Sequence, residues 1–219
     1  MNIKCSVIIP VFNCEEFIEE TVESVLKQTL EEIEIILIDD YSTDKSFEIM
    51  KKIYKNESNC GVALTRNKGI DLSSGRYIAL LDSDDVWLPD KLEKQLNDLK
   101  IKDCKISYCS YGFIDREGNN LGFDFIVPST VNLTKILSKS VISCSTVVAE
   151  RELFLRHKFK TAYYHEDFVL WIDMLKDCKI AFGLTEVLAA IRIMRSSRSG
   201  DKVNSARQKW IVYRKYLNL

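Results

Sequence analysis

Three acidic residues in a stretch of four, Asp82, Asp84 and Asp85, directly follow a short apolar run at residues 77–81. Side chains two positions apart in an extended segment point to the same side. The carboxylates of Asp82 and Asp84 would therefore converge and repel each other unless a cation joined them. Mg²⁺ and Mn²⁺ prefer oxygen ligands and commonly bridge carboxylates to a diphosphate. The spacing predicts a divalent-metal site at Asp82 and Asp84.

The alternative role for this segment is to cap the helix expected at residues 88–99. One aspartate is enough to cap a helix, so capping does not account for three. The segment is not an EF-hand loop, because Val86 and Trp87 interrupt that pattern. The sequence also contains no P-loop and no G-x-G-x-x-G motif.

A second apolar run, at residues 34–38, ends in Asp39 and Asp40. A carboxylate at this point would accept hydrogen bonds from a nucleobase N–H or a ribose hydroxyl, and the alternative is an Asx-turn into the next helix. Arg66 is expected near the same edge, where it would contact a diphosphate or hold Asp40. A solvated surface arginine is the alternative for this residue.

Glu166 and Asp167 open a segment with helical periodicity that continues to residue 178. Acidic residues at a helix N-terminus are ordinary, because they interact favourably with the helix dipole. The functional interpretation is a general base that takes the proton from an acceptor hydroxyl. The neighbouring His165 is expected to be structural or partly exposed rather than a ligand.

The elements that would position these residues are short apolar runs alternating with segments of helical periodicity. We expect strands at 4–10, 34–38, 77–81, 105–110, 145–149 and 187–193. We expect a helix capped by Asn13, further helices over 42–53, 62–72 and 88–99, and a last one that begins at Glu166. In the helix over 42–53, the side chains expected toward the core are Phe47, Ile49, Met50 and Ile53. The alternation predicts an α/β fold with a mostly parallel sheet flanked by helices. Ligands of such sheets bind beyond the carboxyl ends of the strands.

We divide the chain into three parts. Residues 1–110 form a nucleotide-binding half, residues 111–195 a smaller acceptor-binding and catalytic half of the same domain, and residues 196–219 a basic amphipathic tail. From Arg192 to the C-terminus there are eight Lys and Arg residues against Asp201 alone. We expect this tail to dock on an anionic membrane surface. A solvated helix and a helix packed against a partner subunit are the alternatives.

The composition argues against several classes of protein. A formal net charge of -1 over 219 residues lacks the basic excess of a nucleic-acid-binding protein. The seven cysteines include no C-x-x-C pair, so neither a disulfide framework nor a zinc site is indicated. Neither a signal peptide nor a run of about 20 apolar residues is found. We therefore expect a cytoplasmic protein with reduced, buried thiols, peripheral on the inner face of the cytoplasmic membrane if the tail docks there.

Together the motifs resemble the family 2 glycosyltransferases of the GT-A fold, which are inverting enzymes widespread in bacterial envelope polysaccharide synthesis. The resemblance extends over about residues 4–199 and is carried by the segments 6–13, 38–44, 66–70, 75–85 and 166–171. The first four segments are specific only together, in this order and spacing.

The resemblance implies a nucleotide-sugar donor, most often a UDP-sugar, and Mn²⁺ or Mg²⁺ as cofactor. Asp84 would be the principal metal ligand, with Asp82 holding the donor ribose or metal-bound waters. Asp167 would be the catalytic base, with Glu166 close by. The implied donor-binding residues are Pro10, Phe12, Asn13, Asp40, Arg66 and Asp82.

The implied reaction is the metal-dependent, inverting transfer of a sugar to a hydroxyl of a glycan or lipid-linked saccharide in cell-surface polysaccharide, lipopolysaccharide or capsule synthesis. The Gln-x-x-Arg-Trp motif of the processive enzymes is absent, so we expect transfer of a single sugar. Tyr41 stands where the family usually has Gly. Met194, a poor ligand for these ions, stands where many relatives carry a His.

Two other functions compete with this interpretation. One is a non-catalytic protein that binds a nucleotide-sugar or acts as a scaffold in a glycan assembly complex. The other is a sugar nucleotidylyltransferase, which would normally carry a Gly-rich loop after the first strand. Residues 12–16 contain no glycine, which counts against the second alternative.

Overall fold

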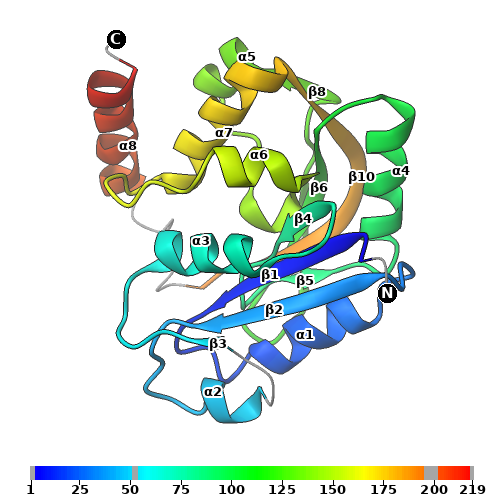
Figure 1. Cartoon of the computed structure of the whole chain (residues 1–219), viewed down its shortest axis with the longest axis vertical. Coiled ribbons are helices and arrows are strands. Elements are labelled where there is room, and N and C mark those ends of the chain that lie inside the picture. The colour runs from blue at the N-terminus through cyan, green and yellow to red at the C-terminus, as the bar shows by residue number, and fades with distance from the viewer. Residues whose placement is uncertain (1–2, 51–53, 195–201, 218–219) are drawn as a thin grey trace.

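A computed structural model of the chain describes residues 3–50, 54–194 and 202–217. One sheet crosses the described part, in the strand order β3-β2-β1-β4-β9-β6-β10-β5, with β7 paired to β6 and β8 paired to β10 (Figure 1). The strands are β1 (Cys5–Val11), β2 (Ile33–Asp39), β3 (Tyr54–Lys55), β4 (Tyr77–Leu80), β5 (Val86–Trp87), β6 (Ile106–Ile114), β7 (Asn120–Phe125), β8 (Thr130–Asn132), β9 (Val148–Glu150) and β10 (Ile180–Arg192).

The direction of the strands brings the predicted polar residues to one edge. β1 pairs in parallel with β2 and β4, and β2 pairs in parallel with β3. β9 runs antiparallel to both β4 and β6, so these two strands point the same way, and β10 is parallel to β6. The carboxyl ends of β1, β2, β4, β6 and β10 therefore lie at one edge of the sheet.

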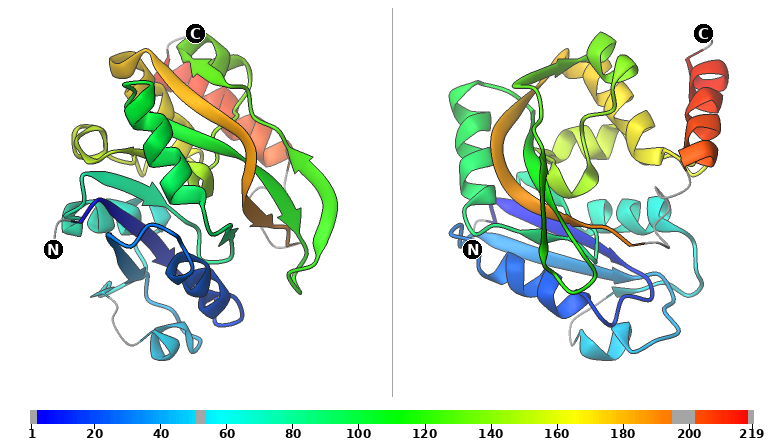
Figure 2. Two further views of the ribbon diagram at one scale, coloured as in Figure 1. Left: turned by 90° about the vertical axis from the view of Figure 1, so that its right-hand side faces the viewer. Right: turned by 180° about the vertical axis from the view of Figure 1, so that it is seen from behind.

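Helices cover both faces of this sheet (Figures 1 and 2). One apolar core includes side chains from α3, α6 and α7, and a second core, on the other face, includes side chains from α1 and α4. The α-helices are α1 (Ile18–Leu26), α2 (Ser46–Ile49), α3 (Val62–Leu72), α4 (Lys91–Ile101), α5 (Leu133–Ser138), α6 (Arg151–Arg156), α7 (Glu166–Cys178) and α8 (Lys202–Ile211). The α/β architecture predicted from the alternating pattern is confirmed.

The segment between β2 and β3 differs from its prediction. The helix expected over residues 42–53 is the four-residue α2, and Phe47 and Ile49 are exposed, although Met50 is buried. Ile53 lies outside the described residues. The carboxylate of Asp44 accepts the backbone N–H groups of Glu15 and Ser46, so the loop is tied to the turn after β1 instead of extending a helix.

The predicted N-cap role of Asn13 is also wrong. α1 begins at Ile18, and the side-chain oxygen of Asn13 accepts the backbone N–H of Thr43 at 2.8 Å. Asn13 has φ 48°, in the left-handed region that Asn tolerates better than most residues. It therefore joins two loops rather than starting a helix.

The second half contains more sheet than its sequence pattern predicted. The turn signals around residues 112–122 belong to the β6–β7 hairpin. The strand expected over 145–149 is shorter and later, because residues 144–146 form a 3-10 turn before β9. The division drawn at residue 110 falls inside β6. The tail forms α8 and a π-helical turn, η3 (Val212–Tyr216), and the buried Val212 joins the core beneath α7. The described part of the tail thus packs on its own chain, which differs from the three predicted arrangements.

Among the described residues, no helix is long and apolar enough to cross a bilayer. All seven cysteines are free thiols; four of them are buried, and Cys60, Cys104 and Cys178 are partly exposed.

Candidate active site

A cleft of about 740 Å³ lies at the carboxyl edge of the sheet, within the range of small-molecule binding sites. Its walls come from the ends of β1, β2, β4 and β10, from α3, and from the start of α7. The lining includes Pro10, Phe12, Asp40, Arg66, Asp82, Asp84, Asp85, Ser143, Cys144, Tyr164, His165, Glu166, Asp167 and Arg192. Among the sequence-predicted site residues, only Asn13 does not line this cleft.

The acidic segment after β4 forms the floor of the cleft. Burial and, next, the charge of Asp82 raise the pKa of Asp84 to about 6. Burial and the neighbouring carboxylates also raise the pKa of Asp85 well above its usual range. The carboxylates are therefore close enough for their repulsion to oppose ionisation, and a bound cation would relieve it.

Two residues that the sequence reasoning did not select hold this acidic segment in place. The hydroxyl of Ser145 accepts the backbone N–H of Asp82 at 3.1 Å and donates to the carboxylate of Asp85. Arg192 donates its backbone N–H to Oδ1 of Asp85 and its Nε–H to the carbonyl of Asp84, both at 2.9 Å. The conformation of the acidic segment is thus fixed from outside itself.

The guanidinium of Arg192 is buried and reaches three elements. Besides Asp84, it donates to the carbonyls of Asp115 and Arg116 in the β6–β7 turn at 2.9 Å and pairs with Glu20 of α1. In the sequence, Arg192 was counted among the basic residues toward the C-terminus. Its position at the end of an apolar run is the one sign of its role. Met194, two positions later, does not line the cleft.

Arg66 connects the acidic segment after β4 to the start of α7. Its guanidinium is buried and binds Oδ1 of Asp82 at 2.6 Å and Oε1 of Glu166 at 3.1 Å. Burial disfavours the charged form of Arg66, but its acidic neighbours outweigh burial and raise its pKa. The solvated alternative for this residue is wrong, and its two ion pairs are with Asp82 and Glu166 rather than with Asp40.

Asp167 lies in the first turn of α7, partly open to the cleft. Burial, and after it the charge of Glu166, raise its pKa, whereas the positive charge of Arg66 acts to lower it. A carboxylate with a raised pKa is a stronger base than a carboxylate whose pKa has its usual value. The arrangement suits Asp167 to accept a proton from a molecule bound in the cleft.

Asp40, directly after β2, also lines the cleft. Burial alone would raise its pKa, but hydrogen bonds from the backbone N–H of Cys60 at 2.9 Å and of Gly61 at 2.8 Å, and from the side chain of Asn56, hold the pKa below its usual range. Asp40 is therefore ionised and anchors the loop that precedes α3. Nearby Phe12 is half exposed, so its ring is available for stacking.

The acidic segment fits a divalent cation with few protein ligands. Within the described ranges, no three His, Cys, Asp or Glu side chains are grouped so as to hold a metal ion by themselves. Mg²⁺ commonly uses only one or two carboxylates and takes its other ligands from substrate phosphates and water. The pair Asp82 and Asp84 matches this type of site, since burial and, next, the charge of Asp82 raise the pKa of Asp84.

The solved structures similar to this chain share the fold. Staphylococcus aureus TarS residues 1–349, in complex with UDP-GlcNAc, matches with a TM-score of 0.78 and 20% identity over 91% of this chain and 61% of that chain. The mannosyltransferase PcManGT from Pyrobaculum calidifontis, in complex with GDP-Man and Mn2+, matches with a TM-score of 0.77 and 16% identity over 99% of this chain and 64% of that chain. The present chain thus spans somewhat less than two thirds of each.

Sequence comparison gives closer relatives. TuaG of Bacillus subtilis, a glycosyltransferase assigned to teichuronic acid biosynthesis, is 35% identical over 218 residues, covering 95% of this chain and 86% of the relative. The Escherichia coli UDP-Glc:alpha-D-GlcNAc-diphosphoundecaprenol beta-1,3-glucosyltransferase WfgD is 34% identical over 216 residues, covering 94% and 84%. Residues 6–156 match the family model of glycosyl transferase family 2. The chain is therefore a member of glycosyltransferase family 2, a hexosyltransferase-type enzyme built on the GT-A fold.

Proposed function

We propose that this enzyme transfers a single hexose from a UDP-sugar to an acceptor hydroxyl, with inversion, during the synthesis of a cell-envelope polysaccharide. The observation that carries the proposal is the composition of one cleft. It combines an exposed aromatic ring and an anchored carboxylate after β1 and β2, the paired carboxylates Asp82 and Asp84 after β4, and Asp167 at the start of α7. These are the parts needed to bind a nucleotide, hold its diphosphate and deprotonate an acceptor.

The donor would lie along the floor of the cleft. Phe12 and Pro10 would contact the nucleobase, and Asp40 would hold the loop before α3 that lines the same cleft. A uridine nucleotide is favoured because WfgD is named for its use of UDP-Glc and TarS binds UDP-GlcNAc. Ser143 and Tyr164 line the same cleft.

Asp84, with Asp82 beside it, would hold Mn²⁺ or Mg²⁺. The bound cation would neutralise negative charge on the departing diphosphate. Arg66 keeps Asp82 in position through its 2.6 Å ion pair, and Arg192 keeps the backbone of Asp84 in position. The chain itself therefore holds the carboxylate of Asp82 and the backbone of Asp84 in place before the donor binds.

The proposed reaction is one displacement at the anomeric carbon. The acceptor oxygen forms a bond to that carbon while the bond to the diphosphate oxygen breaks, and the leaving UDP keeps the electron pair. Asp167 takes the proton of the acceptor hydroxyl as the new bond forms. Because the attack comes from the face opposite the leaving group, the anomeric configuration inverts.

The acceptor is proposed to be a lipid-linked saccharide, since WfgD is named for a diphosphoundecaprenol-linked acceptor. The scaffold alternative and the enzyme differ in turnover. Incubation of the purified protein with UDP-glucose, UDP-galactose or UDP-GlcNAc, a GlcNAc-diphospho-lipid acceptor and Mn²⁺ is expected to release UDP and give a product of inverted configuration by NMR. A protein that binds UDP-sugars but releases no UDP with any acceptor would support the scaffold alternative.

The role of Asp167 is tested with a matched pair of variants on one helix. Asp167→Asn is expected to lower kcat by ~10²–10⁴, the usual contribution of a general base. Asp177→Asn, at the far end of α7 in an exposed ion pair with Arg156, is expected to leave kcat unchanged. Near-full transfer activity in Asp167→Asn would exclude this residue as the base.

A further inference from the structure

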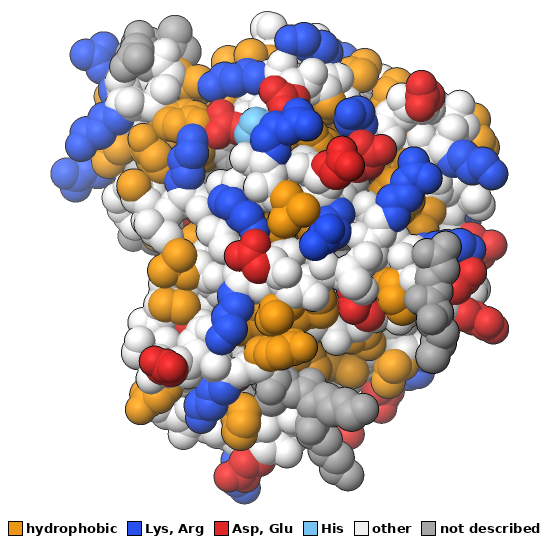
Figure 3. Space-filling view, in the orientation of Figure 1, with side chains coloured by type: hydrophobic (Ala, Val, Ile, Leu, Met, Phe, Trp, Pro, Cys, Tyr) orange, Lys and Arg blue, Asp and Glu red, His pale blue; other side chains and the backbone are white. Residues whose placement is uncertain are grey.

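The described part of the tail, residues 202–217, has an outer face of unusual composition. It contains basic residues and no acidic residue. Val203 is 83% exposed and Trp210 62% exposed, and Arg207, Arg214 and Lys215 are also exposed. Figure 3 shows Lys and Arg side chains gathered over α8, with apolar side chains between them. The outer face therefore presents a tryptophan and an aliphatic side chain among cations.

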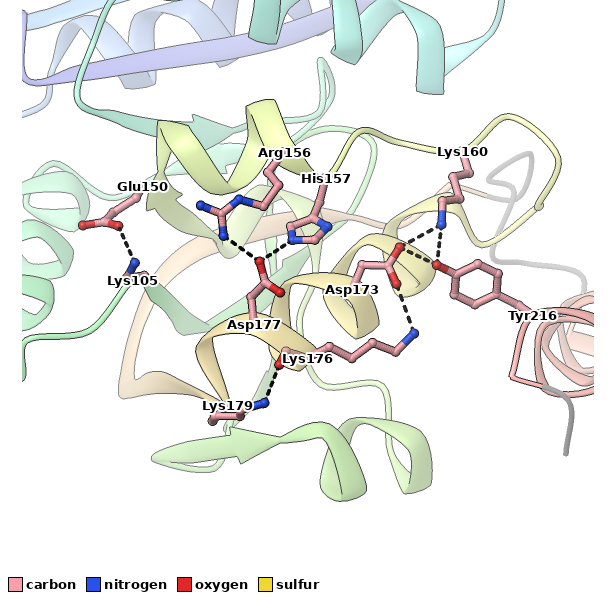
Figure 4. Close-up of polar contacts among 10 residues, drawn as sticks. All are labelled: Lys105, Glu150, Arg156, His157, Lys160, Asp173, Lys176, Asp177, Lys179 and Tyr216. Atoms are coloured by element: carbon pink, nitrogen blue, oxygen red, sulfur yellow. Dashed lines mark hydrogen bonds and ion pairs between the residues drawn. The ribbon is translucent and has the colours of Figure 1, made fainter.

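The inner face of the tail packs on the catalytic helix and its surroundings. Val212 is fully buried, and the hydroxyl of Tyr213 donates to the carbonyl of Leu137. The hydroxyl of Tyr216 bonds to Asp173 of α7, which also pairs with Lys160 at 2.8 Å (Figure 4). These contacts hold η3 against α5 and the middle of α7.

The inner face also reaches the start of α7, where the proposed base lies. His165 is the residue before α7 and lines the cleft. Its Nε2 lies 3.0 Å from the carbonyl oxygen of Ser205, to which it donates, and 3.2 Å from the hydroxyl of the same residue. The ammonium of Lys209 lies over the ring of Phe168, 4.7 Å from its centre. α8 therefore contacts the residues on both sides of Glu166 and Asp167.

We propose that the outer face of α8 and η3 docks on an anionic lipid bilayer, and that this docking increases the transfer rate by holding α8 against the start of α7. The inference rests on the proposed function, because it assumes that Asp167 acts as the base. Its partner is a lipid surface bearing negative headgroups, the kind of surface on which a lipid-linked saccharide is presented.

Charge and side-chain type favour a bilayer over a second copy of the chain. Two copies meeting through this face would bring like charges together, with no acidic residue in 202–217 to offset them. Tryptophan and basic side chains on one helix face are the combination that binds at the bilayer interface. Each basic residue near an anionic surface strengthens binding by roughly fivefold, and burial of the Trp210 ring adds to this.

Binding is tested by flotation with vesicles of phosphatidylcholine containing about one third phosphatidylglycerol, and with phosphatidylcholine alone. The full chain is expected to float with the anionic vesicles only. The double variant Trp210→Ser/Arg207→Gln is expected to lose at least tenfold in its partition constant. The matched control Ile101→Ser/Lys100→Gln, which removes an 82% exposed aliphatic side chain and its basic neighbour at the end of α4, is expected to float as the wild type does. Failure of the wild type to float would overturn the proposal.

The effect of membrane docking on the transfer rate is tested with a short-chain acceptor that stays in water, so that vesicles cannot act by concentrating the acceptor. Anionic vesicles are expected to raise kcat several-fold in the wild type and in the control. The double variant is expected to keep the basal rate and lose the stimulation. Flotation without any change in kcat would overturn the coupling, and vesicle-independent self-association through Trp210 would overturn the choice of partner. Flotation needs no turnover, so a protein that floats but transfers no sugar would instead contradict the proposed function.

Discussion

Removal of the charge of Arg66 by the substitution Arg66→Met is expected to affect stability and catalysis in different ways. The side chains of Arg66 and Glu166 are almost completely buried, whereas that of Asp82 is 36% exposed. Breaking a buried ion pair from one side commonly costs about 3–5 kcal/mol. Because water can reach Asp82, we expect the lower end of this range, about 3 kcal/mol. For a chain of this size each kcal/mol lowers Tm by about 2–4 °C, so Tm should fall by about 6–12 °C.

The catalytic effect follows from the pKa of Asp167. The positive charge of Arg66 acts to lower that pKa, so its removal raises it further. The base must be deprotonated to act, and its acid limb in the pH dependence of kcat should move to higher pH. An opposite charge within about 4–6 Å shifts a carboxyl pKa by about 1–3. Arg66 pairs directly with Glu166 rather than with Asp167, so the expected result is a displacement of the acid limb toward higher pH.

The assay is the pH–rate profile of UDP release between pH 5 and 9, with Tm measured across the same range. The control is Arg116→Met, which removes an exposed arginine paired with Glu16 on the surface. It should change stability by less than about 1 kcal/mol and leave the profile in place. An unchanged acid limb in a folded Arg66→Met protein would refute the electrostatic link between Arg66 and the base.

Two further predictions concern buried cations. Arg192→Lys keeps the positive charge but loses the forked guanidinium that binds both Asp84 and the β6–β7 turn. The Mn²⁺ concentration for half-maximal activity should therefore rise about tenfold in this variant, whereas Arg116→Lys should leave it unchanged. An unaltered Mn²⁺ titration in Arg192→Lys would contradict the role of Arg192 in holding Asp84. The ammonium of Lys91 is fully buried without a hydrogen-bond partner among the described residues, and burial lowers its pKa from 10.5 to about 8. Because the folded pKa lies below the unfolded one, the charge destabilises the fold below pH 8, and this penalty disappears toward pH 10.5. Lys91→Met should therefore raise the free energy of unfolding by about 3 kcal/mol at pH 7, less the lost contact of the ammonium with the Trp87 ring. Urea unfolding should show a smaller gain at pH 10 than at pH 7. A gain in stability that does not change with pH would indicate a packing effect instead.

Much of the site could be predicted because sheet topology converts sequence order into spatial position. Once β1, β2 and β4 were recognised as parallel strands, the residues following each strand had to meet at one edge. That argument placed Phe12, Asp40 and Asp82 together, and the start of α7 was recognisable from its periodicity. The structure brings Asp167 into the same cleft.

The predictions that failed concern residues whose partners are distant in sequence. Asn13 and Asp44 have the side chains of helix caps, but each bonds to a loop about thirty positions away. Ser145 and Arg192 bond to the acidic segment across intervals of about 60 and 110 residues. A periodic pattern contains only local information, so it gives no sign of such contacts.

The tail shows the same limit. Its basic and aromatic composition predicted an interacting helix, but composition does not reveal which side faces inward. In the structure, Tyr213 and Tyr216 lie on the inner face of the tail and pack on the chain, whereas Trp210 lies on the outer face and is exposed.

The central claim is that Asp84 takes part in binding a nucleoside diphosphate together with a divalent cation. Isothermal titration calorimetry of UDP with and without Mn²⁺, on the wild type and on Asp84→Asn, tests it most directly. Asp71→Asn, in an exposed pair with Lys158, serves as the control. We expect UDP binding that is at least tenfold tighter with Mn²⁺ in the wild type and in the control, with this enhancement lost in Asp84→Asn. Equal UDP affinity with and without Mn²⁺ in the wild type, or an enhancement that persists in Asp84→Asn, would contradict the claim.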